Sequence, residues 1–336
     1  MKSVYIGFPK AKTVKVLEEK VTAPSSGEIL CQAEKSLISI GTETFCLRGV
    51  FDPGTNWASW VNYPFRPGYS MVARVCAVGA DVEGVEEGDR VLASVPHQQF
   101  FKTSPERVFP IPDGVDSEEA TWGTLANTTQ LGVRRGKVAL GETVGVVGLG
   151  ILGQLITQYL YVSGARKIIA VDTISMRLES AKRHGATHVF QGPAQDARET
   201  VQEITEGKML DAVWDATGHP TVLAACVQLL RKRGRVILIG DCPTPSEQYL
   251  GPGVVSDSIA ILGIHGSSSP PAYSEFTPWT QRQMIALFYD YLLQGRMHVA
   301  DLITHHHRPT EAPKVYNRLL EDRSTSIGVI FDWDRL

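Results

Sequence analysis

Residues 143–153 read TVGVVGLGILG, and this stretch decides how the second half of the chain is interpreted. Its first five residues are an apolar run typical of a buried strand, and the apolar pattern that starts at Leu152 is typical of a helix. Three glycines stand at the turn, namely Gly148, Gly150 and Gly153. In a G-x-G-x-x-G motif at such a turn, the glycines permit a tight bend, the approach of a pyrophosphate and close helix packing. The motif therefore predicts a dinucleotide-binding site at the positive end of the helix.

Apolar strands alternate with helical patterns from Glu142 onward. The predicted strands are Thr143–Val147, Lys167–Val171, Thr187–Phe190, Asp211–Asp215, Arg235–Ile239 and Ile259–Ile264. The predicted helices are Leu152–Ser163, Met176–His184, Pro220–Arg231 and Trp279–Gln294. This alternation is the signature of βαβ units. We therefore expect an α/β fold, with a doubly wound parallel sheet in residues 123–296.

The first part of the chain, up to about Pro112, has short β-like runs separated by turn residues. Val72–Val78 and Arg90–Val95 are two of these runs. After His298 come a helical pattern at Ala312–Glu321 and a β-like run at Ser326–Phe331. We expect this closing stretch to rejoin the first part, so that residues 1–122 and 297–336 form a second, β-rich domain. A chain of 336 residues is long enough for two domains.

Composition narrows the classes of partner. The formal net charge is −3 and Lys and Arg are scattered, which argues against nucleic-acid binding. No stretch approaches the roughly 20 apolar residues of a membrane span, and residues 1–12 lack the pattern of a signal peptide. The five cysteines form no Cys-x-x-Cys pair. We expect a cytoplasmic protein with free thiols and no membrane partner.

The cofactor prediction extends beyond the glycines. Asp172 comes nineteen residues after Gly153, at the end of a predicted strand, where a carboxylate can accept hydrogen bonds from both ribose hydroxyls and repel a 2′-phosphate. NAD is therefore favoured over NADP, although Arg177 could stack on adenine or weaken that preference. Alternatively, Asp172 merely caps the helix that starts near Ser175.

Other predicted cofactor contacts follow strand ends, because ligands of open α/β sheets collect at that edge. They lie in the segments Asp215–Gly218 and Ile239–Asp241 and in Gly266-Ser267, for which a plain turn is the alternative. The complete predicted set is Gly148, Gly150, Ile151, Leu152, Gly153, Asp172, Thr173, Arg177, Ala216, Thr217, Gly218, Gly240, Gly266 and Ser267.

Three further motifs carry a family resemblance. They are Gly41-Thr42-Glu43, Arg66-Pro67-Gly68-Tyr69-Ser70 and Gly88-Asp89-Arg90-Val91. With the glycine motif, they resemble the medium-chain dehydrogenase/reductase superfamily over nearly the whole chain. The resemblance implies a GroES-like catalytic domain beside a Rossmann domain, a small-molecule substrate, and a homodimer joined through the edge strand Ile259–Ile264.

The resemblance also implies a metal-free site. Where zinc members of this superfamily carry their ligands, this chain has Ile40, Tyr69 and Thr124, none of which is a usual zinc ligand. The cysteines of the structural zinc lobe are absent too. Together with Pro96-His97 and Leu302–His305, the pattern looks most like zinc-independent members related to bacteriochlorophyllide dehydrogenases. We also interpret the run His305–His307 as solvated or turn-forming, because adjacent strand residues face opposite ways.

Without zinc, hydrogen-bond donors must polarise the substrate oxygen and a general base must accept the proton of the alcohol. The resemblance gives Thr42 a hydroxyl-relay role, and Tyr69 could donate to an oxyanion. His97 could be a base or a substrate ligand, with Glu43 orienting one of these groups. Each of these three residues could instead have a purely structural role. Thr42 could bond to the local backbone, Tyr69 could pack in the core, and His97 could be a hydrogen-bonded core or surface histidine.

Four residues are weaker candidates for substrate contact. Ser39 and Asn127 could hydrogen-bond to the substrate or to the nicotinamide ribose. Trp57 and Trp60 belong to an aromatic loop that could cover a ring or sugar, or could simply pack.

The sequence thus predicts an NAD-dependent, zinc-independent enzyme that interconverts a secondary alcohol and its ketone. The alcohol would belong to a sugar, a cyclitol or a hydroxyalkyl side chain. A zinc-free quinone or enoyl reductase is one alternative, and a non-catalytic dinucleotide-binding protein is another.

Overall fold

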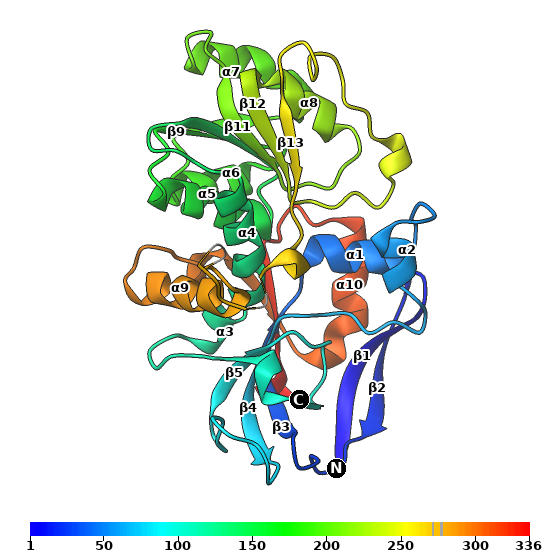
Figure 1. Ribbon diagram of the computed structural model, residues 1–336. Helices are drawn as coiled ribbons and strands as arrows, with labels where there is room; N and C mark the ends of the chain where they lie inside the picture. The colour runs from blue at the N-terminus through cyan, green and yellow to red at the C-terminus, as the bar shows by residue number, and fades with distance from the viewer. Residues whose placement is uncertain (271, 276–277) are drawn as a thin grey trace. The chain divides into compact units, whose positions relative to one another are not determined.

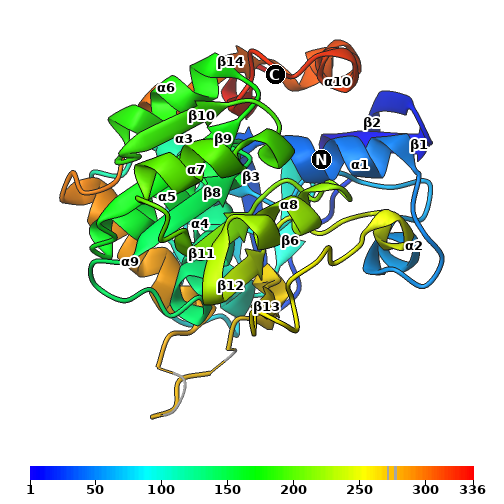
Figure 2. The ribbon, with the colours of Figure 1, turned by 90° about the horizontal axis from the view of Figure 1, so that it is seen from above.

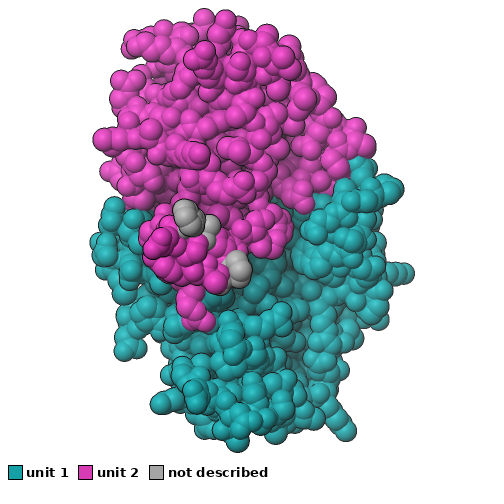
Figure 3. All heavy atoms as spheres, viewed as in Figure 1, with its two compact units in different colours: residues 1–124, 285–336 teal, residues 125–284 magenta. Residues whose placement is uncertain are grey.

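The computed structural model describes residues 1–270, 272–275 and 278–336. The chain divides into two compact units, shown in different colours in Figure 3. Unit 1 comprises residues 1–124 and 285–336, and unit 2 comprises residues 125–284. Residues 285–296, which the sequence pattern assigned to the dinucleotide-binding domain, belong to unit 1.

Unit 2 is built on a six-stranded parallel sheet (Figure 1). Its strands, in spatial order, are β10 (His188–Gln191), β9 (Lys167–Asp172), β8 (Thr143–Val147), β11 (Leu210–Asp215), β12 (Leu230–Leu238) and β13 (Ala260–Gly263). The strand order reverses beside β8, as in doubly wound dinucleotide-binding sheets. This sheet confirms the predicted α/β fold class, and each of the six predicted strands overlaps an observed one.

Helices connect these strands and lie beside the sheet (Figure 2). They are α4 (Gly123–Arg135), α5 (Ile151–Val162), α6 (Ser175–Arg183), α7 (Arg198–Ile204) and α8 (Val222–Gln228). The prediction of a helix over Pro220–Arg231 was too long, because Leu230 already pairs with Leu210 as the first residue of β12. Helix α7 was missed, since Val201 is its one buried side chain and Ile204 is the only other apolar residue in its seven positions.

Unit 1 contains a β-rich sheet and a separate hairpin. The sheet strands are β14 (Ile303–His307), β15 (Gly328–Asp332), β3 (Ile29–Leu37), β4 (Met71–Val78), β5 (Arg90–Ala93) and β7 (Val108–Pro110), with β6 (Phe100–Thr103) on β3. The hairpin pairs β1 (Lys2–Lys10) with β2 (Thr13–Lys20). Strand β15 pairs antiparallel with β3, and Ile330 lies opposite Leu37. Residues 328–332 therefore belong to the same sheet as residues 29–37.

Short helices complete unit 1. They are α1 (Ile40–Arg48), α2 (Asn56–Trp60), α3 (Ser117–Ala120), α10 (Ala312–Glu321) and α9 (Gln281–Leu293), which begins in unit 2. One apolar core joins α1 and α10 to the sheet through buried residues that include Leu47, Val315 and Phe331. Burial of such side chains is the dominant favourable contribution to folding.

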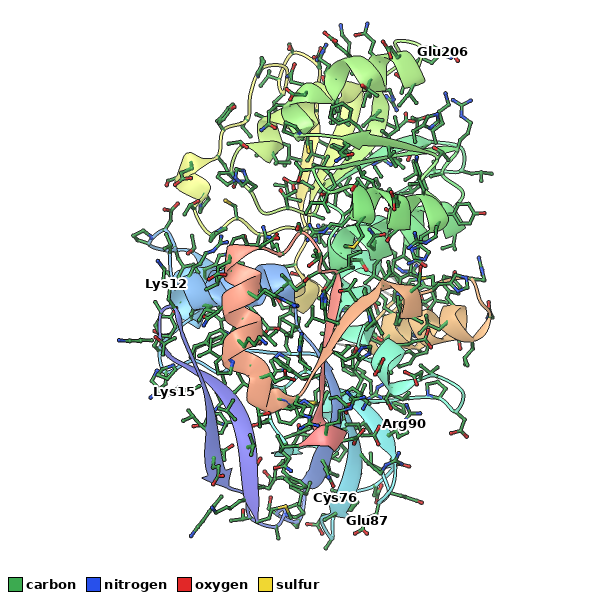
Figure 4. The ribbon with its side chains drawn as sticks, turned by 180° about the vertical axis from the view of Figure 1, so that it is seen from behind. Lys12, Lys15, Cys76, Glu87, Arg90 and Glu206 are labelled. Carbon is green, nitrogen blue, oxygen red and sulfur yellow. The ribbon has the colours of Figure 1, made fainter. Side chains whose placement is uncertain are left out.

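The structure shows the surroundings of the Gly-Asp-Arg-Val motif and of the cysteines. Arg90, labelled in Figure 4, is the arginine of the Gly-Asp-Arg-Val motif, and its Nη2 donates to Val115 O at 3.0 Å and to Ser117 Oγ at 2.8 Å. The motif thereby ties β5 to the segment before α3. All five cysteines are free thiols, and Cys76 is the exposed one (Figure 4).

The histidine run is not a turn. Residues 303–307 form β14, parallel to β15, so the turn alternative is wrong, whereas His306 is exposed as the solvated alternative predicts. The rings of His305 and His307 stack with centroids 6.1 Å apart, whereas His306 faces the other way and its Nε2 lies 2.8 Å from Glu118 Oε2. Among the described residues, no helix is long and apolar enough to cross a membrane.

Candidate functional site

The glycine motif of unit 2 forms the turn between β8 and α5. Gly148 has φ +84°, and a Cβ there would lie 2.6 Å from Thr217 Cγ2. A Cβ on Gly153 would lie 1.9 Å from the carbonyl oxygen of Gly148, so the third glycine allows α5 to pack on the turn. A Cβ on Gly150 would meet no atom within 4 Å, which leaves open space where a pyrophosphate would approach.

Asp172 fixes the glycine turn to the end of β9. Its Oδ2 accepts a hydrogen bond from Leu149 N–H at 2.6 Å, and its Oδ1 accepts one from Ile174 N–H at 2.9 Å. Arg177 Nη1 lies 3.9 Å from Oδ2. The N-cap of α6 is Ile174 rather than Asp172. The carboxylate is therefore held beside the proposed dinucleotide site, with its charge only distantly paired.

The segments after β11 and β12 lie against each other. A Cβ on Gly240 would lie 2.2 Å from Gly218 N, so both positions need the close backbone approach that glycine permits. Asp215 Oδ1 accepts hydrogen bonds from Thr217 N–H at 2.9 Å and from Thr217 Oγ1 at 2.6 Å. Burial nevertheless raises the pKa of Asp215 to about 6. The sequence singled out this segment for its backbone and missed the titrating carboxyl group.

Gly266 and Ser267 lie in a short 3-10 helix, Gly266–Ser268. A Cβ on Gly266 would lie 2.3 Å from Thr128 Oγ1, and Ser267 N–H donates to His265 Nδ1 at 3.3 Å. Asn127, almost fully buried, accepts a hydrogen bond at Oδ1 from Ser269 Oγ at 3.1 Å. These local bonds give this segment the geometry of a packed turn.

Three hydroxyl groups converge in unit 1, and we call Ser39, Thr42 and Tyr69 the hydroxyl cluster. Helix α1 positions two of them, since Ser39 is its N-cap and Thr42 lies in its first turn; the helix ends at Gly49 in a left-handed conformation. Tyr69 O–H donates to Ser39 Oγ at 2.5 Å, and its oxygen lies 3.3 Å from Thr42 Oγ1. Thr42 and Tyr69 are partly exposed. Ser39 is buried and burial dominates the surroundings of the Tyr69 phenol, so the cluster lies at the margin of the buried interior of unit 1.

The ionisation of Tyr69 is suppressed. Burial raises the pKa of Tyr69 to about 12; hydrogen bonds with Ser39 and Thr42 act against this rise, and the nearby charge of Glu43 adds to it. At neutral pH the phenol is therefore protonated and serves as a hydrogen-bond donor.

Glu43 and His97 lie beneath the hydroxyl cluster, and both side chains are about 1% exposed. His97 Nε2 lies 3.1 Å from Glu43 Oε2, and His97 Nδ1 lies 2.8 Å from Ser36 Oγ. A Cβ on Gly68 would lie 2.7 Å from the imidazole, so this glycine makes room for His97. Both ring nitrogens are engaged inside unit 1.

Three residues that the sequence did not single out complete this buried group. Tyr316 on α10 donates its hydroxyl to Glu43 Oε2, and Trp333 Nε1 donates to Ser36 Oγ at 2.9 Å. Ser36 and Tyr316 are fully buried, and Trp333 is nearly so. No local sequence motif identifies these residues as partners, because Tyr316 follows Glu43 by 273 positions and Trp333 follows Ser36 by 297.

The two tryptophans of the aromatic loop differ in environment. Trp57 is 6% exposed in the core of unit 1 and stacks on Phe51 with centroids 5.9 Å apart. Trp60 is 42% exposed and meets Phe65 edge-on at 5.2 Å. Of the two indoles, Trp60 is the one with an accessible face.

The family resemblance aligned Ile40, Tyr69 and Thr124 with zinc ligands. Ile40 is 7% exposed and belongs to the apolar core, and Tyr69 is bonded to Ser39 and Thr42. In the part of the chain that the structure describes, no group of three or more His, Cys, Asp or Glu side chains could hold a metal ion.

Comparisons with known proteins bear on the class of this protein. The family model described as zinc-binding dehydrogenase matches residues 152–282, which lie within unit 2. Sorbitol dehydrogenase of Bacillus subtilis is 29% identical over 239 residues, covering 61% of this chain and 67% of the relative. D-guloside 3-dehydrogenase of Escherichia coli is 24% identical and covers 80% of this chain and 78% of the relative.

Solved structures agree with the fold. A short chain alcohol dehydrogenase of Escherichia coli, solved with NADH, has a TM-score of 0.81 at 21% identity, covering 98% of this chain and 99% of that one. A dehydrogenase structure from Sinorhizobium meliloti, solved with NADP, has a TM-score of 0.80 at 17% identity, covering 99% of each chain. The chain is thus an oxidoreductase that is similar, over residues 152–282, to the zinc-binding dehydrogenase family. Its predicted fold, a Rossmann domain and a GroES-like domain, is confirmed.

Proposed function

We propose that this enzyme interconverts a secondary alcohol and its ketone, with NAD as cofactor and without a catalytic zinc ion. The observation that carries the proposal is the hydroxyl cluster. Tyr69 occupies a position where zinc members of the superfamily hold a metal ligand, and it is bonded to Ser39 and Thr42. Hydrogen-bond donors then stand where the metal would polarise the substrate oxygen.

The residues of unit 2 fit a dinucleotide. The open space over Gly150 suits a pyrophosphate, and Asp172 lies at the carboxyl end of β9 with a negative charge that disfavours a 2′-phosphate. Similar structures have been solved with NADH and with NADP, so the comparisons leave the choice of cofactor open. We base the preference for NAD on Asp172. When bound, the cofactor supplies the nicotinamide that accepts or donates the hydride.

The residues of unit 1 do not fit zinc. Ile40 has no donor atom, and neither Tyr69 nor Thr124 is a usual zinc ligand. The family match to zinc-binding dehydrogenases covers residues 152–282 and so does not include these positions. We therefore assign no step to a metal ion.

The hydroxyl cluster can perform the proton chemistry. As the alcohol is oxidised, its C–H hydrogen leaves as hydride with the electron pair. Its O–H proton is released to water through the cluster, in which each hydroxyl group that accepts a proton gives up its own hydrogen, so that the cluster gains no net proton. In the reverse direction Thr42, and Tyr69 once its hydrogen turns from Ser39 to the substrate, donate to the oxygen that gains negative charge. The raised pKa of Tyr69 keeps the phenol in this donating form at neutral pH.

A polyol or sugar is the substrate class we favour. The sorbitol and D-guloside dehydrogenases are named for substrates of this kind. The exposed indole of Trp60 offers an apolar face on which a sugar ring could pack. We also propose a homodimer joined through β13, which is the edge strand of its sheet and is partly exposed.

The proposal is tested on one purified sample by metal analysis, by NADH and NADPH titration, and by turnover of a panel of polyols and glycosides. We expect less than stoichiometric zinc, tighter binding of NADH than of NADPH, and NAD-linked oxidation that chelators do not inhibit. Stoichiometric zinc whose removal abolishes turnover would refute the metal-free mechanism. Tight NADH binding without turnover on any substrate would favour a non-catalytic protein, and an NADPH preference would favour a quinone or enoyl reductase.

A further inference from the structure

The buried carboxylate of Glu43 is surrounded by hydrogen-bond donors. Its Oε1 accepts from Ser39 N–H at 2.7 Å, and its Oε2 is shared by the Tyr316 hydroxyl and by His97 Nε2. Among the described residues, His97 is the one basic side chain within 4.0 Å of the carboxylate. A buried charge needs such partners, because burial without them is costly.

The direction of the hydrogen bonds can be assigned from Trp333. An indole N–H can only donate, so Ser36 Oγ must accept from Trp333. Ser36 is fully buried, and among the described residues the other hydrogen-bond partner of its hydroxyl group is His97 Nδ1. Since buried polar groups are almost always hydrogen-bonded, Nδ1 accepts and Nε2 carries the proton. His97 is then a neutral imidazole that donates to Glu43.

The other tautomer and the imidazolium ion satisfy fewer groups. In both of them Nδ1 carries a hydrogen, which would leave the Ser36 hydroxyl without an acceptor in a site closed to water. The chain of bonds also stops at Trp333, which cannot accept a proton. This group therefore does not form a proton path that leads beyond Trp333.

Glu43 connects this group to the hydroxyl cluster. It holds the backbone N–H of Ser39 at the first residue before α1, and the hydroxyl of the same serine accepts from Tyr69 at 2.5 Å. A carboxylate at a helix N-terminus is also favoured by the helix dipole. A shift of Glu43 would thus displace Ser39 and, with it, the donor that faces the substrate.

We propose that Glu43 is a positioning residue: an ionised carboxylate, held by a neutral Nε2–H His97 and by Tyr316, that sets the geometry of the Ser39–Tyr69–Thr42 hydroxyl cluster. His97 then acts through Glu43 and does not touch the substrate. The inference rests on the proposed function for its kinetic part, whereas the protonation state of His97 is independent of it.

The first experiment is nitrogen-15 NMR of protein labelled at histidine, with the His97 signals assigned by their loss in His97→Asn. We expect the neutral Nε2–H tautomer at neutral pH. The Nδ1–H tautomer or an imidazolium would overturn the proposed arrangement. This measurement needs no substrate, so it gives a result even if the proposed function fails.

The second experiment is a double-mutant cycle of Glu43→Gln and Tyr69→Phe on the NAD-linked reaction, with kcat normalised to NADH-binding sites. Glutamine has the same size as Glu43, but its NH₂ group replaces a carboxylate oxygen. This NH₂ group would face a hydrogen-bond donor and could not accept from it. We expect Glu43→Gln to lower kcat about tenfold in the wild type and less than twofold in the Tyr69→Phe background, because coupled residues are non-additive. An equal loss in both backgrounds would show that Glu43 does not act through Tyr69.

Discussion

The phenolic hydroxyl of Tyr69 donates to the hydroxyl oxygen of Ser39 at 2.5 Å. This bond uses the one hydrogen of the phenol and leaves the Ser39 hydrogen for another acceptor. Thr42 Oγ1 lies 3.3 Å from the same phenol oxygen, so the three hydroxyl groups form one connected cluster.

Replacing Tyr69 by Phe removes this donor without changing the ring. We expect kcat to fall about 100-fold, the usual cost of deleting an oxyanion donor, while the fold is retained. The measurement is steady-state NADH formation with the best substrate. Tyr289→Phe is the matched control, because Tyr289 Oη donates to Ala120 O at 3.1 Å in the core of unit 1. Loss of activity in both variants to the same extent would contradict a specific role for Tyr69.

Two glycine substitutions separate cofactor binding from folding. Ala at Gly153 would place Cβ 1.9 Å from Gly148 O, so we expect a lower melting temperature and loss of NADH binding. Ala at Gly150 meets no atom within 4 Å, so we expect a near-normal melting temperature with NADH affinity reduced at least about tenfold. Thermal unfolding and NADH fluorescence titration measure the two effects. Unchanged NADH affinity in Gly150→Ala would place the pyrophosphate elsewhere.

Asp172→Asn tests the choice of cofactor. We expect the Kd for NADH to rise about tenfold, since the amide loses one acceptor and cannot hold both ribose hydroxyls equally well. The Kd for NADPH should rise less or fall, because the negative charge opposite a 2′-phosphate is gone. Paired titrations measure the ratio, with Glu179→Gln on the exposed face of α6 as control. Equal losses for both cofactors would mean that Asp172 only supports the glycine turn.

Asp215 makes stability depend on pH. Burial raises its pKa in the fold to about 6, above its ordinary value, so its favourable contribution is complete at low pH and is lost as the pH rises through about 6. Asp215→Asn keeps an acceptor for Thr217 and cannot ionise. We expect the variant to gain about 1.4 kcal/mol relative to wild type between pH 5 and pH 8, because about one pKa unit of the change lies between pH 5 and the folded pKa of about 6, and each unit is worth ~1.4 kcal/mol.

Urea unfolding at the two pH values measures this gain. Asp211→Asn, at the opposite end of β11, serves as the control, because Asp211 pairs with Arg231 near the surface. A gain that does not change with pH would show that Asp215 is not the titrating group.

Local patterns were enough to predict the α/β unit. The glycine motif and the alternation of apolar strands with helices depend on neighbouring residues, and β8 was predicted at Thr143–Val147 with its observed bounds. Errors arose where tertiary pairing overrides local pattern. Leu230 is helical by sequence pattern but pairs with Leu210, and the histidines of β14 form a strand because β15 lies beside them.

The site was predictable only in pieces. Thr42, Tyr69, Glu43 and His97 were each nominated by residue type and resemblance, and the structure brings the first two into one group and the last two into another. Tyr316 and Trp333 could not be found this way, since only the folded chain brings them to residues that lie hundreds of positions earlier.

The pairing of β15 with β3 has a consequence for synthesis on the ribosome. Residues 1–124 are made before residues 285–336, which supply strands β14 and β15 of their sheet and the buried partners Trp333 of Ser36 and Tyr316 of Glu43. Unit 2 is contiguous and can fold as soon as it emerges, because domains generally fold as units during translation. Unit 1 must instead wait, partly formed, until β15 has been made. Chaperone dependence of the nascent chain should therefore be concentrated in its first 124 residues.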